Sequence, residues 1–238
     1  MKRIILCLTI MILSELSFSQ KIILHRNTGD SQIFYSSSVD SITFLPFTCG
    51  DEIRYAGKTY HTVLIGSQCW MKENLDVGTM ISGGTNQTNN GMIEKYCYND
   101  VPDSCTRYGG LYQWNEMMQY LTTQGVKGIC PEGWHIPTES ELQTLKTTVG
   151  NSSNALKALG QGSGGGSGTN TSGFSALLAG QRFFADGNFY FMGSACYFWS
   201  STQSGSAAYR IDLYSNDNQI YFIADSKNYG FSIRCLKN

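Results

Sequence analysis

Hydrophobic and polar positions follow their most regular pattern between residues 138 and 150. Thr138 precedes Glu141 by three positions, which is the spacing of a capping box at the start of a helix. Gly150 stands where a left-handed residue commonly ends a helix. The pattern therefore predicts a helix from Thr138 to Gly150. Its apolar stripe, at helical spacing, consists of Leu142, Leu145 and Val149.

A second apolar repeat follows Gly109 and Gly110 and ends at Gly125. Its members recur three or four positions apart, as the buried face of a helix does, so the repeat predicts a second helix. We expect this face to pack in the core rather than to line a ligand site. The repeat consists of Leu111, Trp114, Met118 and Leu121.

Elsewhere the chain alternates with the period of a strand. Residues 59–65 are expected to form one strand after a turn at Gly57 and Lys58, with a return strand from Cys69. His61 lies in this strand without an evident carboxylate or cysteine partner, so we expect it on the sheet surface. The last third predicts strands at 182–184, 188–191, 197–202, 207–214, 219–224 and 231–236. Strands that follow two helices indicate an α+β domain.

The chain divides into three parts. Residues 1–19 have a basic start, an apolar run and small residues at Ser17 and Ser19, as in a signal peptide that directs secretion. Residues 20–46 read as a β-hairpin leader, and residues 47–238 as the main domain. The glycine-rich stretch 162–173 resembles a linker in composition. Because only strands follow it, we expect it to be an excursion within that domain.

Composition narrows the possible partners. The 238 residues are 41% hydrophobic and 13% aromatic, which is ample for a packed core, and the formal net charge is −1. A chain without a basic patch is not expected to bind nucleic acid. No segment after the predicted signal peptide has the length of a transmembrane helix. We expect a secreted or cell-surface protein without a transmembrane segment.

Cysteine usage agrees with export. Of eight cysteines, Cys7 lies in the predicted signal peptide and seven remain. No Cys-x-x-Cys pair or Cys/His cluster has zinc spacing, so disulfides are favoured over metal ligands in an oxidising compartment. An odd number leaves one free thiol, but arithmetic alone leaves the pairing open.

Several motifs in the chain resemble those of a known family. Gly133-Trp-His-Ile-Pro-Thr-Glu-Ser-Glu-Leu142 is similar to a signature of formylglycine-generating-enzyme-like domains, which share the C-type-lectin-like fold. From Cys49 to the C-terminus the chain more closely resembles the Fibrobacter succinogenes major paralogous domain, found in secreted and surface-attached bacterial proteins. The motifs include Ile65-Gly-Ser-Gln-Cys-Trp-Met-Lys-Glu-Asn-Leu75, Tyr108-Gly-Gly-Leu-Tyr-Gln-Trp114 and Gly230-Phe-Ser-Ile-Arg-Cys235.

The resemblance implies a fold and a set of disulfides. The expected fold is C-type-lectin-like, with two helices flanking a twisted antiparallel sheet and long loops. The family pattern, together with short loops, favours Cys49 with Cys69, Cys97 with Cys105, and Cys130 with Cys235, leaving Cys196 as the free thiol. The family carries no agreed biochemical activity.

Catalysis is not expected. No nucleophilic triad, phosphate-binding loop or zinc helix has the required spacing in this sequence. Formylglycine-generating enzymes use a reactive cysteine pair, whereas only Cys196 remains as a thiol here. An oxidase is therefore the weaker alternative to a binding protein.

The preferred hypothesis is a surface binding or adhesion module for a carbohydrate or protein. Aromatic residues and turn residues near the C-terminus are the candidate contacts, with core packing as the alternative for the aromatics. Asn216, Asp217 and Asn218 supply oxygen ligands for a Ca²⁺ ion, although a plain turn explains them more simply. No other cofactor is expected. The binding candidates are Tyr197, Trp199, Tyr209, Tyr214, Asp217 and Asn218.

A structural role is the remaining alternative. An exposed strand edge invites pairing with another chain. The hairpin at residues 20–46 would then join neighbouring subunits in a surface assembly.

Overall fold

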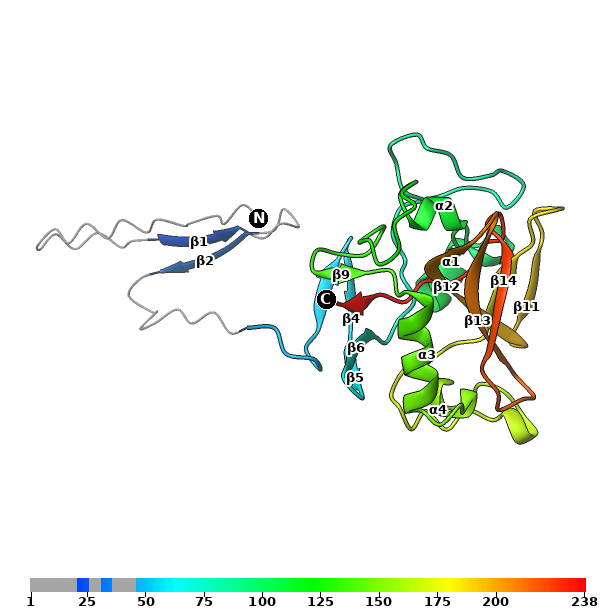
Figure 1. Ribbon diagram of the computed structural model, residues 1–238. Coiled ribbons are helices and arrows are strands. Elements are labelled where there is room, and N and C mark those ends of the chain that lie inside the picture. The colour runs from blue at the N-terminus through cyan, green and yellow to red at the C-terminus, as the bar shows by residue number, and fades with distance from the viewer. Residues whose placement is uncertain (1–20, 26–30, 36–45) are drawn as a thin grey trace, which may run out of the picture. The chain divides into compact units, whose positions relative to one another are not determined.

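The structure is a computed structural model that describes residues 21–25, 31–35 and 46–238. The chain forms two compact units, Met1–Pro46 and Phe47–Asn238. In the first unit, β1 (Lys21–His25) pairs antiparallel with β2 (Ser31–Tyr35), which is the expected hairpin (Figure 1). The predicted signal peptide lies outside the described residues. Within the described ranges, no helix is both long and apolar enough to cross a membrane.

A five-stranded sheet forms the centre of the second unit. Three of its four neighbouring strand pairs are antiparallel, and the fourth pair, β10 with β12, is parallel. The reason is that β11 turns back from β10, and the chain then returns on the other side of β10 to form β12. The strand order is β11 (Phe189–Met192), β10 (Ala179–Arg182), β12 (Ala195–Ser204), β13 (Ala207–Tyr214) and β14 (Tyr221–Ser226).

A smaller sheet joins the beginning and the end of the unit. The order is β5 (Thr62–Ile65), β6 (Gln68–Met71), β15 (Leu236–Lys237) and β9 (Trp134–His135). Leu236 lies opposite both Trp70 and His135, so the C-terminal strand lies between β6 and β9 and joins them. The remaining strands form two separate two-stranded sheets. These are β3 (Ile53–Tyr55) with β4 (Lys58–Tyr60), and β7 (Thr79–Met80) with β8 (Glu94–Lys95).

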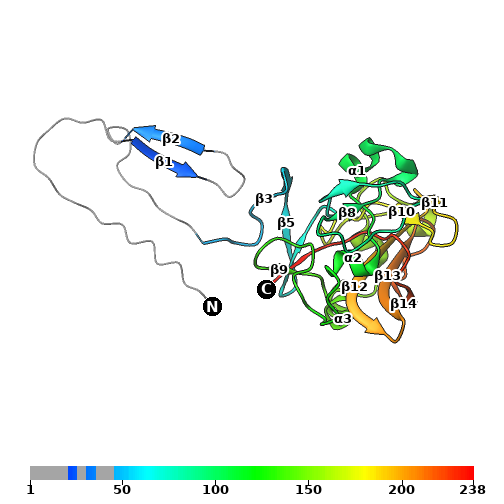
Figure 2. The same ribbon diagram turned by 90° about the horizontal axis from the view of Figure 1, so that it is seen from above.

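The helices are few and short, so the unit is an α+β domain that consists mostly of sheet. The predicted helix at 138–150 is confirmed as α3 (Glu139–Thr148), with both hydrogen bonds of the capping box between Thr138 and Glu141. It runs alongside β12 and β13 (Figures 1 and 2). The others are α1 (Pro102–Tyr108), α2 (Trp114–Met117), α4 (Ser153–Leu156) and the 3₁₀ turns η2 (Tyr98–Asp100) and η3 (Gly164–Gly166).

Strand alternation divides the core into two clusters, one on each face of the large sheet. Phe198 of β12 packs in the cluster that contains Leu142 and Leu145 of α3. Its neighbour Trp199 packs in the other cluster, together with Trp114 of α2. Successive residues of a strand point to opposite faces, so β12 contributes to both cores.

The predicted second helix is wrong in extent. Gly109 does not begin a helix but ends α1, where its N–H group donates to Cys105 and its φ is 80°. Leu111 pairs with Tyr96 in a β-bridge, and Leu121 is 54% exposed. The helix stops after one turn because Gln119 and Tyr120 adopt left-handed backbone angles. The helical spacing of these apolar residues was coincidental.

Two other expectations have different outcomes. The predicted strand 59–65 is interrupted at His61, where β4 ends and β5 has not begun. The glycine-rich stretch is indeed an excursion within one unit. Gly166 is buried in it, and a Cβ there would lie 2.4 Å from the carbonyl oxygen of Ser215, so only glycine fits.

Three disulfides link the second unit, and they are the pairs that the family resemblance implies. Cys49–Cys69 ties the segment before β3 to β6, and Cys130–Cys235 ties the loop before β9 to the segment before β15. Cys97–Cys105 fastens α1 to the segment before η2. Cys196 is a free, buried thiol.

Candidate functional site

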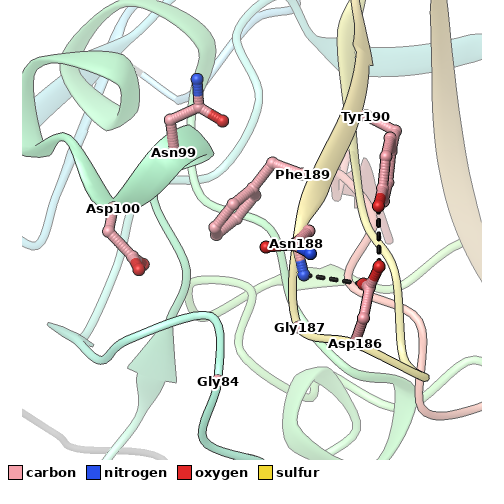
Figure 3. A pocket seen from close by; sticks show the side chains of 8 residues that line it. All are labelled: Gly84, Asn99, Asp100, Asp186, Gly187, Asn188, Phe189 and Tyr190. Atoms are coloured by element: carbon pink, nitrogen blue, oxygen red, sulfur yellow. Dashed lines mark hydrogen bonds between the residues drawn. The ribbon is translucent and has the colours of Figure 1, made fainter.

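The hairpin of β10 and β11 faces the turn η2 across a surface pocket of about 500 Å³ (Figure 3). Three separate segments line it: the loop before β8, the turn η2 and the hairpin. Most of the lining side chains are polar, and two are aromatic. The lining residues are Gly84, Asn99, Asp100, Asp186, Gly187, Asn188, Phe189 and Tyr190.

Asp100 anchors one wall of this pocket. Asn99 and Asp100 both have a φ of 56°, a left-handed conformation that asparagine and aspartate tolerate better than most residues. The Asp100 carboxylate accepts hydrogen bonds from the Gly83 N–H group at 2.8 Å and the Ser82 hydroxyl at 3.2 Å. Arg182 also stabilises this loop, because its Nε donates a hydrogen bond to the Gly83 carbonyl oxygen at 2.8 Å. The turn and the loop therefore support each other.

Asp186 organises the opposite wall. Its carboxylate accepts from the Asn188 N–H group at 2.9 Å, as in an Asx turn, and from the Tyr190 hydroxyl at 2.7 Å (Figure 3). The Tyr190 hydrogen bond lowers the pKa of Asp186 below its usual range, so the carboxylate is ionised at neutral pH. The two walls nearly touch at Gly187, where a Cβ would lie 2.6 Å from the Gly83 carbonyl oxygen.

The pocket suits a ligand with hydroxyl groups and a weakly polar face. Two carboxylates and two amides offer hydrogen-bond acceptors and donors, while Phe189 and Tyr190 offer aromatic surface. Its volume falls in the range of small-ligand pockets, roughly 300–1,000 Å³. The pocket therefore offers hydrogen bonds from several side chains together with contact to an aromatic ring.

A row of neighbouring aromatic rings runs through the same unit and includes Tyr190, which lines the pocket. Neighbouring ring centroids in the row lie 4.9 to 6.4 Å apart. The row is exposed at its ends, where Phe191 is 53% and Tyr221 39% accessible, and buried at Phe231. Exposed aromatic surface therefore begins beside the pocket. The row consists of Phe191, Tyr190, Phe183, Phe184, Tyr229, Phe231, Tyr197, Tyr214 and Tyr221.

The aromatic candidates from the sequence do not line this pocket. Tyr197 and Trp199 belong to the hydrophobic core, and the indole N–H group of Trp199 donates to the Tyr112 carbonyl at 2.9 Å. Tyr214 is half-buried, and its hydroxyl donates to Asp212 at 3.1 Å. Tyr209 is also half-buried, in β13. Trp199 is buried and has no exposed surface for a ligand, so its role is to pack in the core.

The turn at residues 216–218 is held by its own contacts. The Asp217 carboxylate accepts from the Tyr221 hydroxyl, and the Asn218 side-chain oxygen accepts from the Ser152 hydroxyl at 2.8 Å. The buried Lys157 ammonium donates to the Asp217 carbonyl at 2.8 Å, which places a positive charge beside the proposed Ca²⁺ ligands. Asn216 is exposed. In the part of the chain that the structure describes, no group of three His, Cys, Asp or Glu side chains is arranged for a metal.

Cys196 is poorly placed for thiol chemistry. Its side chain is buried, and burial raises the pKa of the thiol to about 12, so the reactive thiolate is disfavoured. The other six cysteines between residues 46 and 238 form disulfides. Cys196 is therefore the one free thiol in this part of the chain.

The residues that line the pocket had only a weak signal in the sequence. The Asp-Gly pair at residues 186–187 is typical of a hairpin turn, and Asn99 and Asp100 are residue types that are common in turns. Each signal is local, whereas the pocket requires the two turns to meet. Two turns rich in Asp and Asn, each beside aromatic residues, are the only pattern that could have drawn attention to them.

Comparison with protein-family models matches residues 63–237 to the Fibrobacter succinogenes major domain. Neither curated proteins nor solved structures gave a match to the chain.

Proposed function

This chain belongs to the Fibrobacter succinogenes major domain family, and from that premise we propose that it is a non-catalytic binding module, secreted or displayed at a bacterial cell surface. The three disulfides are compatible with an extracellular location. The fold that we propose for the domain is C-type-lectin-like, with a twisted sheet that supports long surface loops.

The ligand that we propose is a carbohydrate. The supporting observation is the pocket in which Asp100, Asp186 and Asn188 surround Phe189 and Tyr190. A sugar has hydroxyl groups for the polar side chains and C–H faces for the rings. A surface protein is the alternative ligand, and the exposed aromatic row beside the pocket is the feature that favours it.

A glycan screen of the oxidised protein, with and without Ca²⁺, tests this function. Asn188→Ala is the informative variant, because its side chain is exposed while its backbone N–H group makes the turn hydrogen bond. Asn115→Ala, an exposed asparagine in α2, is the matched control. We expect Asn188→Ala to weaken the binding of a glycan found in the screen by about tenfold, and the control to leave it unchanged. Equal binding by both variants would place the ligand elsewhere.

Assembly through the N-terminal hairpin is a second candidate function. The hairpin of β1 and β2 forms a unit separate from the main domain, and an isolated two-stranded hairpin is marginally stable in water. A third strand from another subunit would stabilise it. Removal of residues 20–46 tests this role: loss of oligomers with unchanged glycan binding supports assembly, and an unchanged oligomeric state contradicts it. A formylglycine-generating-type oxidase has less support, since Cys196 is buried.

A further inference from the structure

A second pocket, of about 220 Å³, lies at the other end of α1. The last turn of α1, the segment after β6, the segment after Phe174 and the segment before β15 all contribute to its walls. Four of the lining side chains are cationic and one is acidic. The charged lining residues are Lys58, Lys72, Arg107, Arg234 and Glu73.

Arg234 is the buried cation of this pocket. Its side chain is almost completely buried, with the residue 1% exposed, and burial lowers the pKa of the guanidinium to about 9, so it is charged at neutral pH. Its acceptors are Asn74 Oδ1 at 2.6 Å and the carbonyl oxygens of Met71, Phe174 and Ser175. All four acceptors are neutral. No carboxylate among the described residues forms an ion pair with it, although burying an unpaired charge is costly.

Arg234 also retains a donor. A guanidinium has five N–H groups, and Nε, both groups of Nη1 and one of Nη2 have protein acceptors. The second N–H group of Nη2 has no hydrogen-bond acceptor within residues 46–238. A buried donor that lines a pocket and lacks a protein partner is a natural contact for a ligand oxygen.

The acidic residue of the pocket is already engaged. Both Glu73 carboxylate oxygens accept from His61, one from its backbone N–H group and the other at the ring nitrogen Nδ1, each at 2.8 Å. The His61 ring lies between Glu73 and Glu52, which corrects the expectation that it has no carboxylate partner. Glu73 therefore directs its hydrogen bonds toward His61, and it acts on Arg234 through its charge without a direct ion pair, so one carboxylate faces four cations in this pocket.

The other cations are only weakly neutralised. Lys58 is 3.5 Å from Asp76, which has a closer partner in Lys95 at 2.5 Å. In the described part of the chain, neither Lys72 nor Arg107 makes an ion pair. The carbonyl groups at the end of α1 are also occupied, since Tyr108 accepts from Asn74 Nδ2 and Thr106 accepts from Lys58. The negative end of the helix dipole is thus partly compensated.

We propose that this pocket binds one small oxyanion, a carboxylate or sulfate group carried by an acidic sugar. Lys72, Arg107 and the remaining Arg234 donor would bind the oxyanion. The volume accommodates such a group, and the surplus of cations supplies the complementary charge. The sugar as the source of the oxyanion rests on the proposed function, whereas oxyanion binding itself does not.

Amide NMR of the oxidised protein tests the proposal with three probes: sodium glucuronate, glucose 6-sulfate and neutral glucose. The reporters are the N–H groups of Gly109, Ala158 and Ser175, which line the pocket. We expect shifts with one or both acidic sugars and none with glucose. High ionic strength should weaken the binding. Equal shifts with glucose would overturn the proposal, and so would the absence of shifts with both acidic sugars.

Charge removal supplies the matched test. Lys72→Ala combined with Arg107→Ala removes two cations from the pocket without disturbing the hydrogen bonds of Arg234. We expect at least about tenfold weaker binding of the acidic sugar. Lys127→Ala combined with Lys146→Ala removes the same charge from residues outside the pocket and should change the affinity little. Equal affinities for the two double variants would overturn the proposal, whereas a failed glycan screen at Asn188 would concern only the first pocket.

Discussion

Helix α1 has a pocket at each end, and the two pockets carry opposite charge. The pocket at η2 presents Asp100 and Asp186, and the pocket at Tyr108 presents Lys72, Arg107 and Arg234. A chain with a formal net charge of −1 thus separates its charges in space. Net charge alone says little about the sites of a protein whose fold brings distant charged residues together.

The two pockets also differ in how they are held. Asp186 is exposed and bonded to residues two and four positions away in the same hairpin. Arg234 is buried and bonded to residues 59 to 163 positions away. We therefore expect substitutions in the acidic pocket to alter binding with little cost in stability, and substitution of Arg234 to affect the whole domain.

Arg234→Met should give the largest effect. The variant keeps much of the side-chain volume but leaves the carbonyl oxygens of Met71, Phe174 and Ser175 and the Asn74 oxygen without a donor. We expect a loss of about 3–5 kcal/mol in the free energy of unfolding, measured by denaturant titration. A loss below about 1 kcal/mol would show that these acceptors find other partners.

Replacing Cys97 and Cys105 by serine should affect both pockets together. The disulfide fastens α1, whose last residues line the basic pocket, to the segment before η2, and η2 lines the acidic pocket. Closing a loop with a sequence separation of 8 contributes about 2–3 kcal/mol in the chain-entropy treatment. Calorimetry should show this loss, and binding should weaken at both ends of α1. Weakening at one end only would mean that the pocket at the other end does not depend on this disulfide.

Local signals explain what the sequence could predict. The capping box and apolar stripe at 138–149 depend on neighbouring residues, so α3 was predictable almost to the residue. The β13 bounds at 207–214 followed from alternation and flanking turns in the same way. The pairing of the cysteines, in contrast, came from resemblance to a family, because the residues alone allowed several connectivities.

Long-range contacts explain what the sequence could not predict. Leu111 matches a helical repeat, but its bridge to Tyr96 prevails over the local pattern. Neither pocket was predicted, because the residues that line each pocket are far apart in the sequence and come together only in the folded chain. His61 shows the same limit, since its partners Glu52 and Glu73 are carboxylates that the strand pattern did not place beside it.

Asp100→Ala should have a moderate effect confined to the acidic pocket. The variant leaves the Gly83 N–H group and the Ser82 hydroxyl without their acceptor, which should cost about 1 kcal/mol. Hydrogen exchange at the Gly83 amide should accelerate, and binding at the basic pocket should stay unchanged. Asp103→Ala, an exposed carboxylate in α1, is the control. Equal exchange rates at Gly83 in both variants would show that Arg182 alone holds the loop.

Tyr190→Phe should give the smallest effect, a change in pH dependence without loss of the fold. The Tyr190 hydroxyl lowers the pKa of Asp186, so the carboxylate keeps its charge as the pH falls and loses it only at the lowered pKa. Without the hydroxyl, the pKa of Asp186 should rise toward its ordinary value, and a ligand that needs the carboxylate should dissociate at a higher pH. Tyr221→Phe is the matched control, because Tyr221 lowers the pKa of Asp217 by an equivalent hydrogen bond outside the pocket. A carboxyl ¹³C titration should show a higher midpoint for Asp186 in Tyr190→Phe alone. Glucuronate binding at the basic pocket should keep the same pH profile in both variants. An unmoved Asp186 midpoint would show that the Asn188 amide, rather than Tyr190, stabilises this carboxylate.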